Sequence, residues 1–401
     1  MWHTSGLNAA PVNAKPSLHY AMLAVALALG WQTLTVTFYW HGNWTALFCT
    51  GDKTNVPPNL IAGTYRFANS GGYDGQMYRY IARDPFNRHG YDKYLDAPMM
   101  RYRRILVPIL AFALAAGSEN WIDAAYIVVI AACMFAGTYW LSRWAVMQGR
   151  NAAWGLLFLL VPSTLISIDT LTVDIALAAL TAGFAYCLAI RSRAGLYFVL
   201  VLACLARETG GLLVGAMCFY ELWSRQWRRA ATWATAAIPA LAWFAYLGAR
   251  LPAPGMLGVP LWFSSVPGQG IIARLLHPRE YALAAPAETI ARIFDGISIV
   301  GIAMAVVIAI MFLMRARKPL PIAAFLYALL ALALSSPLVW TDPFSYPRVL
   351  TPLLMLLPLI AAANQTSLRT WWWTALPLLL VDLRIVLQIG PQMLGIVKGI
   401  V

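Results

Sequence analysis

Carboxylates and arginines in the polar segments between long apolar stretches are the side chains of this chain that can carry chemistry. The longest polar segment is residues 41–104, and in it Asp74 lies between a pair of glycines and Gly75. Glycines permit a tight turn and a close backbone approach to a ligand, and the residues that follow have helix-compatible spacing. A carboxylate near a helix N-terminus is held ionised, as a general base must be.

Asp74 also has a purely structural interpretation, as a residue that caps the following helix. Under the catalytic interpretation, neighbouring polar side chains would orient a sugar by hydrogen bonds. These neighbours are Tyr73, Gln76 and Tyr78, and Asp84 is the next acidic residue along the segment. Three arginines end the segment, namely Arg101, Arg103 and Arg104. They are candidates for anchoring to lipid headgroups and, in second place, for binding substrate.

Two carboxylates, Asp169 and Asp174, lie five residues apart in the turn 162–174. Ionisable groups at a membrane face are functional hypotheses by default. Asp169 is equally suited to cap the next helix. Asp174 is about one turn inside an apolar stretch, where it needs a polar partner, and it is the stronger candidate.

Arginines in two further segments are suited to binding an anion. Arg207 and Glu208 interrupt an apolar stretch, and they either neutralise each other or leave Arg207 free for an anion. Arg348 follows Tyr346 at the mouth of a later apolar stretch, where a guanidinium suits phosphate recognition or lies at the membrane interface.

The composition indicates an integral membrane protein. Of 401 residues, 61% are hydrophobic and 11% are charged, whereas soluble proteins have about 25% charged residues. The net charge of +13 comes from short clusters between apolar stretches, which argues for membrane anchoring rather than for nucleic acid binding. Five scattered cysteines indicate neither a disulfide framework nor a thiolate metal site.

The predicted fold is a single all-α domain, 1–401, with about eleven membrane-spanning helices. Residues 41–104 form the first extracytoplasmic loop, 105–116 a juxtamembrane helix, and 250–290 a second long extracytoplasmic loop. The segment 194–223 is expected to be a hairpin or re-entrant pair broken at its glycines. The candidate spans are 18–40, 121–142, 152–168, 171–190, 194–206, 210–223, 229–249, 291–314, 319–336, 348–363 and 371–390.

Basic loops set the expected orientation, because positive charges stay in the cytoplasm. With these spans, Lys15 and all the short basic loops fall on one side, and only Glu221 of the sixteen acidic residues joins them. We therefore expect a cytoplasmic N-terminus and chemistry on the extracytoplasmic face. The chain contains no phosphate-binding loop and no dinucleotide fingerprint, which argues against a nucleotide-driven mechanism.

The order of these features resembles the GT-C superfamily of membrane glycosyltransferases. The likeness consists of a first span, a long loop with an acid, juxtamembrane helices and a second loop with further acids. The stretch 72–76, with Asp84-Pro85 and the run 103–108, is more closely similar to GT-C-like proteins of bacterial cell-surface glycopolymers. The resemblance implies a location in the bacterial inner membrane, a polyprenyl-phosphate sugar as donor and a glycan, lipid or protein as acceptor. It also implies Asp74 as base, with Arg207 and Arg348 near the donor phosphate.

Many GT-C proteins carry a paired acidic motif in the first loop, whereas here Asp74 is followed by Gly75. A requirement for a divalent cation is therefore left open. The main alternative function is a transporter or flippase of lipid-linked sugars, although no inverted repeat is visible and the charges gather at one face. A non-catalytic scaffold in glycopolymer assembly is a third interpretation.

Overall fold

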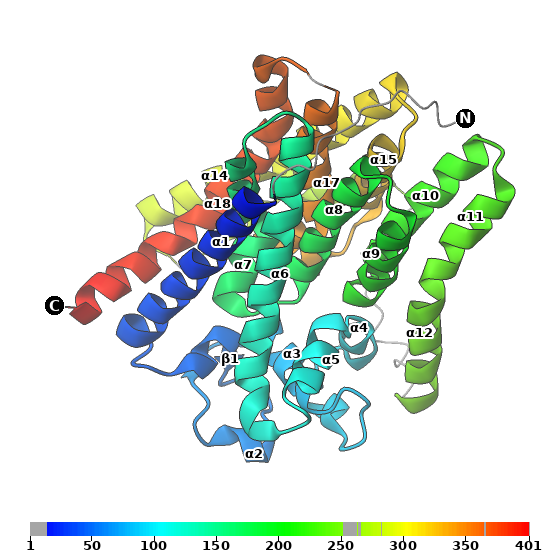
Figure 1. Ribbon diagram of the computed structural model, residues 1–401. Helices are drawn as coiled ribbons and strands as arrows, with labels where there is room; N and C mark the ends of the chain where they lie inside the picture. Colours follow the sequence, from blue (N-terminus) through cyan, green and yellow to red (C-terminus); the bar gives the residue numbers. More distant parts are fainter. Residues whose placement is uncertain (1–13, 252–262, 264–265, 282, 365, 401) are drawn as a thin grey trace.

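The computed structural model describes residues 14–251, 263, 266–281, 283–364 and 366–400. Nearly all of these residues that have regular structure are helical, which confirms the all-α class. Long helices occupy most of the molecule, and the short elements α2 to α5 and β1 gather at one end of them (Figure 1).

Six helices are long and apolar enough to cross a membrane, with lengths from 19 to 32 residues. At 1.5 Å per residue, each spans about 30 Å or more. They support the assignment of a membrane protein. The six are α1 (Lys15–Leu34) continued by η1 (Thr35–Tyr39), α6 (Glu119–Met147), α11 (Trp227–Ala234) continued by η6 (Thr235–Ala237) and α12 (Ile238–Arg250), α14 (Ala285–Arg315), α17 (Ser345–Ala363), and α18 (Leu368–Ile400).

The predicted span 152–168 is not one straight helix. It consists of η4 (Ala152–Leu160) and α7 (Pro162–Thr170), which are bent by 62°. The break falls at Pro162, whose ring cannot continue a preceding helix and which instead starts the next one. Counted as one span, this pair raises the number of candidate spans in the described residues from six to seven.

The remaining apolar helices are shorter than the roughly 30 Å hydrocarbon layer. They are α8 (Asp174–Ala189), α9 (Arg193–Ala206), α10 (Gly211–Trp223) and α15 (Pro319–Ala333). The prediction of eleven regular spans is therefore not confirmed, because four of the predicted spans are helices of only 13 to 16 residues. Periodicity and hydropathy locate these helices but do not show whether each one crosses a bilayer.

Among the helices of more than ten residues, the two most buried are α8 and α17, which pack against each other. Neighbouring helices cover them, so that almost every side chain of either helix is buried. Each begins close to the end where the short elements gather, with Asp174 as the first residue of α8 and Arg348 in the first turn of α17. Charged residues thereby enter the most enclosed part of the fold.

The predicted first loop is a folded cap of short elements. Its strands β1 (Thr50–Gly51) and β2 (Arg66–Phe67) are parallel. Gln76 is buried and fastens the cap, since its amide accepts from Gly51 N (3.2 Å) and Thr54 Oγ1 (3.0 Å) and donates to Gly71 O (3.0 Å). The helical elements are η2 (Trp44–Phe48), α2 (Pro58–Ile61), α3 (Asp74–Arg83), η3 (Tyr91–Tyr94), α4 (Pro98–Arg103) and α5 (Leu106–Leu114).

Gly75 allows α3 to approach the end of α7 more closely than any other residue would. A Cβ built on it would lie 2.2 Å from the carbonyl oxygen of Thr170. Because no side chain fits there, the first turn of α3 can rest directly on the α7 backbone. This contact brings Asp74 next to the start of α8, which lies four residues beyond Thr170.

The helical hairpin 194–223 is interrupted where its glycines lie, as predicted. α9 ends at Ala206, η5 (Glu208–Gly210) follows, and α10 starts at Gly211. A Cβ on Gly210 would lie 2.0 Å from the carbonyl oxygen of Ala203, so the tight turn requires glycine there. The carbonyl of Thr209 accepts from Tyr327 Oη of α15 at 2.9 Å, which satisfies one backbone group freed by the break.

The predicted second loop, 250–290, contains more helix than expected. α13 (Gln269–Leu276) lies within it and α14 already begins at Ala285, while residues 252–262, 264–265 and 282 lie outside the described residues. α13 packs against α14, α15 and the short helix α16 (Pro337–Thr341).

Candidate active site

Asp74 is the first residue of α3 and lies between two arginines. Arg101 Nη1 is 2.9 Å from Asp74 Oδ1, and Arg348 Nη1 is 2.8 Å from Asp74 Oδ2. The carboxylate side chain is 16% exposed, while both arginines are buried. One carboxylate thus joins the cap, through Arg101 of α4, to the helical core, through Arg348 of α17.

Asp174 continues this arrangement into the core. It accepts from Arg348 Nη1 at 3.1 Å and forms an ion pair with Arg207, which precedes η5. Asp174 is buried at the start of α8, where the free N–H groups of the first turn favour a negative charge. Arg207 is therefore not free to bind an anion in this arrangement, contrary to one sequence-based alternative.

Two further bidentate ion pairs complete the set. Arg101 donates through Nε (2.9 Å) and Nη2 (2.7 Å) to Asp96. Arg104 donates through Nε (3.0 Å) and Nη2 (2.6 Å) to Glu208, and through Nη1 to Tyr78 Oη at 3.1 Å. Glu208 thus pairs with the cap rather than with its neighbour Arg207, because adjacent residues do not face each other.

We call these eight side chains the charged cluster. It contains four carboxylates and four guanidinium groups, so its formal charges cancel. Balance of this kind is required, because an unpaired charge in the interior is strongly destabilising. The members are Asp74, Asp96, Asp174, Glu208, Arg101, Arg104, Arg207 and Arg348.

The acids of the cap are held in their ionised form. Burial by itself would raise the pKa of Asp74, but the guanidinium groups of Arg101 and Arg348 outweigh it and leave that pKa well below its ordinary value. Burial likewise opposes ionisation of Asp96, and its hydrogen bonds from Arg101 bring its pKa below the ordinary value. Both carboxylates therefore carry a negative charge at neutral pH.

Aromatic and polar groups form the rim of the cluster next to Arg348. The guanidinium carbon of Arg348 lies 4.8 Å from the centre of the Tyr73 ring, a cation–π distance. Tyr73 Oη donates to Asp342 at 3.0 Å, and Ser345 Oγ donates to the same oxygen at 2.6 Å. Arg348 Nε also donates to the carbonyl of Phe344 at 3.1 Å.

A cavity of about 950 Å³ adjoins this rim. Tyr73 and Phe344, two of the residues that contact Arg348, also line the cavity, so it begins where the charged cluster ends. Its other walls are mainly apolar and come from α1, η4, α7, α14 and α18. Apolar residues of the wall include Leu27, Leu160, Leu165, Ile290, Ile385 and Ile389.

A second basic group faces the same cavity. Arg279, Tyr281 and Arg384 line it. Arg384 Nε and Arg274 Nη2 each donate to Asp295 at 2.6 Å, and Tyr281 Oη donates to the same acid at 2.7 Å. The guanidinium carbon of Arg279 lies 5.2 Å from the centre of the Tyr281 ring, so the group contains three arginines and one carboxylate. Of the charged residues that line the cavity, two are arginines and one, Asp169, is an acid.

Eight of the predicted site residues lie in the charged cluster or on its rim. They are Tyr73, Asp74, Tyr78, Arg104, Asp174, Arg207, Glu208 and Arg348.

The structure places five others elsewhere. Gln76 fastens the cap, and the carboxylate of buried Asp84 accepts from the backbone N–H groups of the loop that follows it, at 2.7 Å each. Arg103 lies over the ring of Phe244 on α12. Tyr346 is buried and donates to Ser298 of α14 at 2.8 Å, so its hydroxyl faces the core.

Asp169 is the fifth residue outside the cluster. It accepts from Trp31 Nε1 of α1 at 2.6 Å and lines the apolar cavity. The left-handed backbone at Leu171 turns the chain between the two acids, so Asp169 and Asp174 face different surroundings. Spacing in the sequence does not reveal this turn.

Sequence reasoning did not single out Asp96, Asp342 or the group around Asp295. Asp96 lies just before a short helix that begins at Pro98, and Arg101 follows it by five residues. An acid and an arginine at this spacing in the sequence could have indicated the ion pair between them. The partners of Asp342 and Asp295 include residues far away in the sequence, so the sequence alone does not indicate a role for these two acids. Within the described ranges, no group of three or more His, Cys, Asp or Glu residues is arranged to hold a metal ion.

Compared with protein-family models, curated proteins and solved structures, the chain matches none of them.

Proposed function

We propose that this protein is a membrane glycosyltransferase that moves a sugar from a polyprenyl-phosphate donor to a glycan, lipid or protein acceptor on the extracytoplasmic face. The observation that carries the proposal is the position of Asp74. It is ionised, partly exposed and held by two arginines, and its neighbour Tyr73 lines the large apolar cavity. A lipid-linked substrate needs all of these features within a few ångströms.

The cavity is suited to the lipid part of such a donor. Polyprenyl chains are branched hydrocarbons, and a mainly apolar wall, to which α14 and α18 contribute, accommodates them by burial of apolar surface. The arginines at its polar edge, Arg279 and Arg384, and Arg348 behind Tyr73 supply positive charge for the phosphate.

The chemical step follows from these placements. The hydroxyl of the acceptor attacks the anomeric carbon of the donor sugar, and its proton passes to the Asp74 carboxylate. The bond between that carbon and the phosphate oxygen breaks, and the polyprenyl phosphate leaves with the electron pair. Arginines beside the leaving phosphate stabilise the charge that develops there.

A carboxylate that two arginines hold is ionised but weakly basic. A donor phosphate would compete with Asp74 for Arg348, because both are anions that accept from the same guanidinium. Loss of that partner raises the proton affinity of the carboxylate. Donor binding would thus activate the base at the moment when the acceptor needs it.

The orientation in the membrane is part of the proposal. Basic residues gather at the ends of α8, α10 and α14 that lie away from the charged cluster, among them Arg191, Arg225 and Arg315. Since basic loops stay in the cytoplasm, the cluster would face the other side. A lipid carrier delivers sugars to that side without nucleotides.

The test is sugar transfer by the purified protein from a panel of polyprenyl-phosphate sugars, with Asp74→Asn compared at matched folded yield. General base catalysis contributes about 10²- to 10⁴-fold, so a loss in that range is expected. Asp92→Asn is the matched control, because Asp92 is an acid of the same cap outside the charged cluster.

Retained transfer by Asp74→Asn would remove Asp74 as the base and leave Asp174 as the next candidate. Absence of transfer by the wild-type protein with every donor would overturn the enzyme proposal. Transport of lipid-linked sugars between the leaflets of a liposome is the measurement that would then support a flippase.

A further inference from the structure

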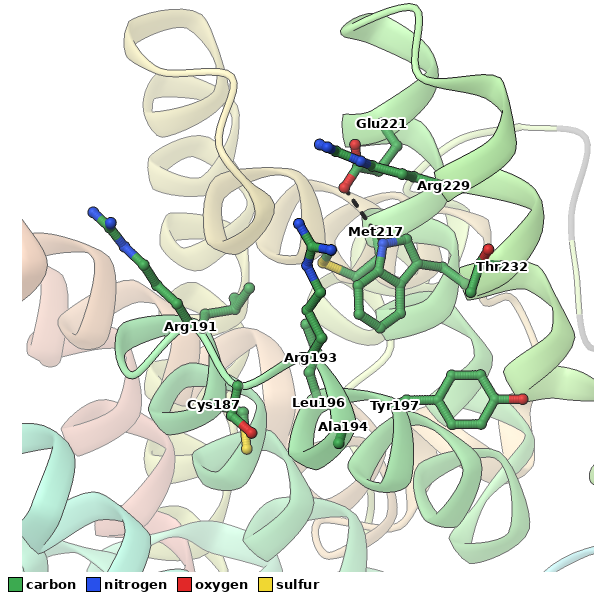
Figure 2. A pocket seen from close by; sticks show the side chains of 13 residues that line it. Cys187, Arg191, Arg193, Ala194, Leu196, Tyr197, Met217, Glu221, Arg229 and Thr232 are labelled. Atoms are coloured by element: carbon green, nitrogen blue, oxygen red, sulfur yellow. Dashed lines mark hydrogen bonds between the residues drawn. The ribbon is translucent and has the colours of Figure 1, made fainter. Parts of the chain in front are cut away.

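A second cavity, of about 530 Å³, opens among the end of α8, the start of α9, α10 and α11. Figure 2 shows its lining, in which Arg193 rises from α9 toward Glu221, with Arg229 on the other side of that carboxylate and Arg191 extending away from both. Nothing in the proposed transfer reaction uses this cavity.

The cavity lies at the far end of the molecule from the charged cluster. α8 begins at Asp174, which belongs to the cluster, and its last turn carries Cys187 and Leu188, which line the cavity. Its 16 residues span about 24 Å. α9 then returns from Arg193 to Ala206 beside the cluster, so the two sites occupy opposite ends of the same pair of helices (Figure 1).

The cavity carries excess positive charge. Three arginines line it, and Glu221 is its one acidic lining residue among the described residues. Trp233 Nε1 donates to Glu221 Oε1 at 3.4 Å, which holds this carboxylate against the wall formed by α10 and α11. Across the described ranges, Arg193 and Arg229 form no ion pair and are exposed, so their guanidinium donors remain accessible.

The surroundings mark the level of a membrane interface. Trp223 and Trp227, in the turn from α10 to α11, are 54% and 68% exposed. Arg317 lies over the Trp223 ring at 4.2 Å. Exposed tryptophan beside arginine is typical of the headgroup layer of a bilayer, where lipid phosphates are concentrated.

The walls between the arginines are mainly apolar. Leu188, Leu196, Met217 and Trp233 contribute to them, and Ser192, Tyr197 and Thr232 add hydroxyl groups. A free phosphate would contact only the arginines and the hydroxyl groups. The phosphate of a lipid would bring a glycerol and the first carbons of its acyl chains, which match the remaining wall.

We propose that this cavity binds a phosphate group, with Arg193 and Arg229 as its direct ligands and an anionic phospholipid as its source. The site would anchor the α8–α9 and α10–α11 turns to the leaflet opposite the charged cluster. Arginine is suited to this role because its planar donors bind two phosphate oxygens at once.

Native mass spectrometry of the delipidated protein tests the proposal, with titrations of phosphatidylglycerol, of phosphatidylcholine with the same acyl chains, and of inorganic phosphate. Phosphatidylglycerol is expected to bind at least tenfold more tightly than phosphatidylcholine. Arg193→Ala and Arg229→Ala should each weaken it by about tenfold, which corresponds to one charge-assisted hydrogen bond.

Arg228→Ala is the matched control, since Arg228 is the exposed neighbour of Arg229 on α11 and does not line the cavity. It should bind phosphatidylglycerol as the wild type does. If inorganic phosphate binds as tightly as the lipid and depends on the same two arginines, the phosphate site stands and its source is soluble. Equal binding of the two lipids, or unchanged binding in both arginine variants, would overturn the proposal. Neither outcome depends on sugar transfer.

Discussion

Substituting Asp174 and Asp74 separately by asparagine tests the balance of the charged cluster. Asparagine keeps the size of the side chain and removes one negative charge. In Asp174→Asn, Arg207 loses the carboxylate with which it pairs, and no second acid is within ion-pair distance of it in the described residues. In Asp74→Asn, Arg101 keeps Asp96 and Arg348 keeps Asp174.

The magnitudes follow from burial and from these remaining partners. Breaking a buried ion pair by removal of one partner costs about 3–5 kcal/mol, and Asp174 and Arg207 are both almost fully buried. Asp74 is 16% exposed, and its loss leaves both arginines paired. We expect a cost of about 1.5 kcal/mol, near that of a charge-assisted hydrogen bond. The free energies of unfolding of the two variants should therefore differ by about 1.5–3.5 kcal/mol.

The assay is reversible unfolding of the purified protein in mixed micelles, followed by circular dichroism as the fraction of denaturing detergent rises. Glu280→Gln is the control, because Glu280 is exposed and forms no ion pair among the described residues. It should unfold as the wild type does. Equal destabilisation by the two aspartate substitutions, or a larger loss of stability in Asp74→Asn, would refute the reasoning that Arg207 depends on Asp174 for its ion pair.

Three further predictions follow from single features. The pKa of Asp74 is lower in the folded protein than its ordinary value of 3.8. Its contribution to stability is therefore complete above that value and disappears as the pH falls toward the folded-state pKa. The free energy of unfolding should be flat above about pH 5 and fall below about pH 4, and the fall should be less steep in Asp74→Asn. Gly75→Ala should abolish stable folding or lower the free energy of unfolding by about 1–3 kcal/mol, because the added Cβ would meet a backbone carbonyl of α7. Gly71→Ala is its control, since a Cβ there has open space, and it should melt as the wild type does. Ile290→Trp would partly fill the apolar cavity and should raise the KM for a polyprenyl-phosphate sugar several-fold with little change in kcat. Ile293→Trp is its control, because Ile293 is on the same helix but outside the cavity, and it should leave KM and kcat unchanged.

The sequence predicted the all-α class and the approximate positions of the helices, because long apolar stretches dominate this chain. It did not predict the bend at Pro162 or the short length of α8 and α15, whereas it did predict short arms in the segment 194–223. Hydropathy reports how apolar a stretch is, and the helix ends depend on local capping and on breaks imposed by proline and glycine.

For the site, residue type and setting were enough to select Asp74, Asp174, Arg207 and Arg348, because charged residues in apolar surroundings need partners. The choice of partner could not be predicted. Arg207 pairs with Asp174 instead of Glu208, and this depends on how α8 and the break after α9 lie in space. Polar residues close to Asp74 in the sequence, such as Gln76, proved to be structural because a folded cap needs internal hydrogen bonds.

The distribution of the charged cluster along the chain has a consequence for the order of assembly in the membrane. Asp174 and Arg207 flank the helices α8 and α9, so this hairpin can enter the bilayer with its two charges already matched. Asp74 meets Arg348 only after 274 further residues have been synthesised. Until α17 arrives, the cap depends on its local pair with Arg101, and the core lacks the residue that joins Asp74 to Asp174. Closure of the site is therefore a late event in biogenesis, and a nascent chain stalled before residue 348 should expose the Asp74 side of the cap to protease, while the Arg104–Glu208 ion pair still holds its other side.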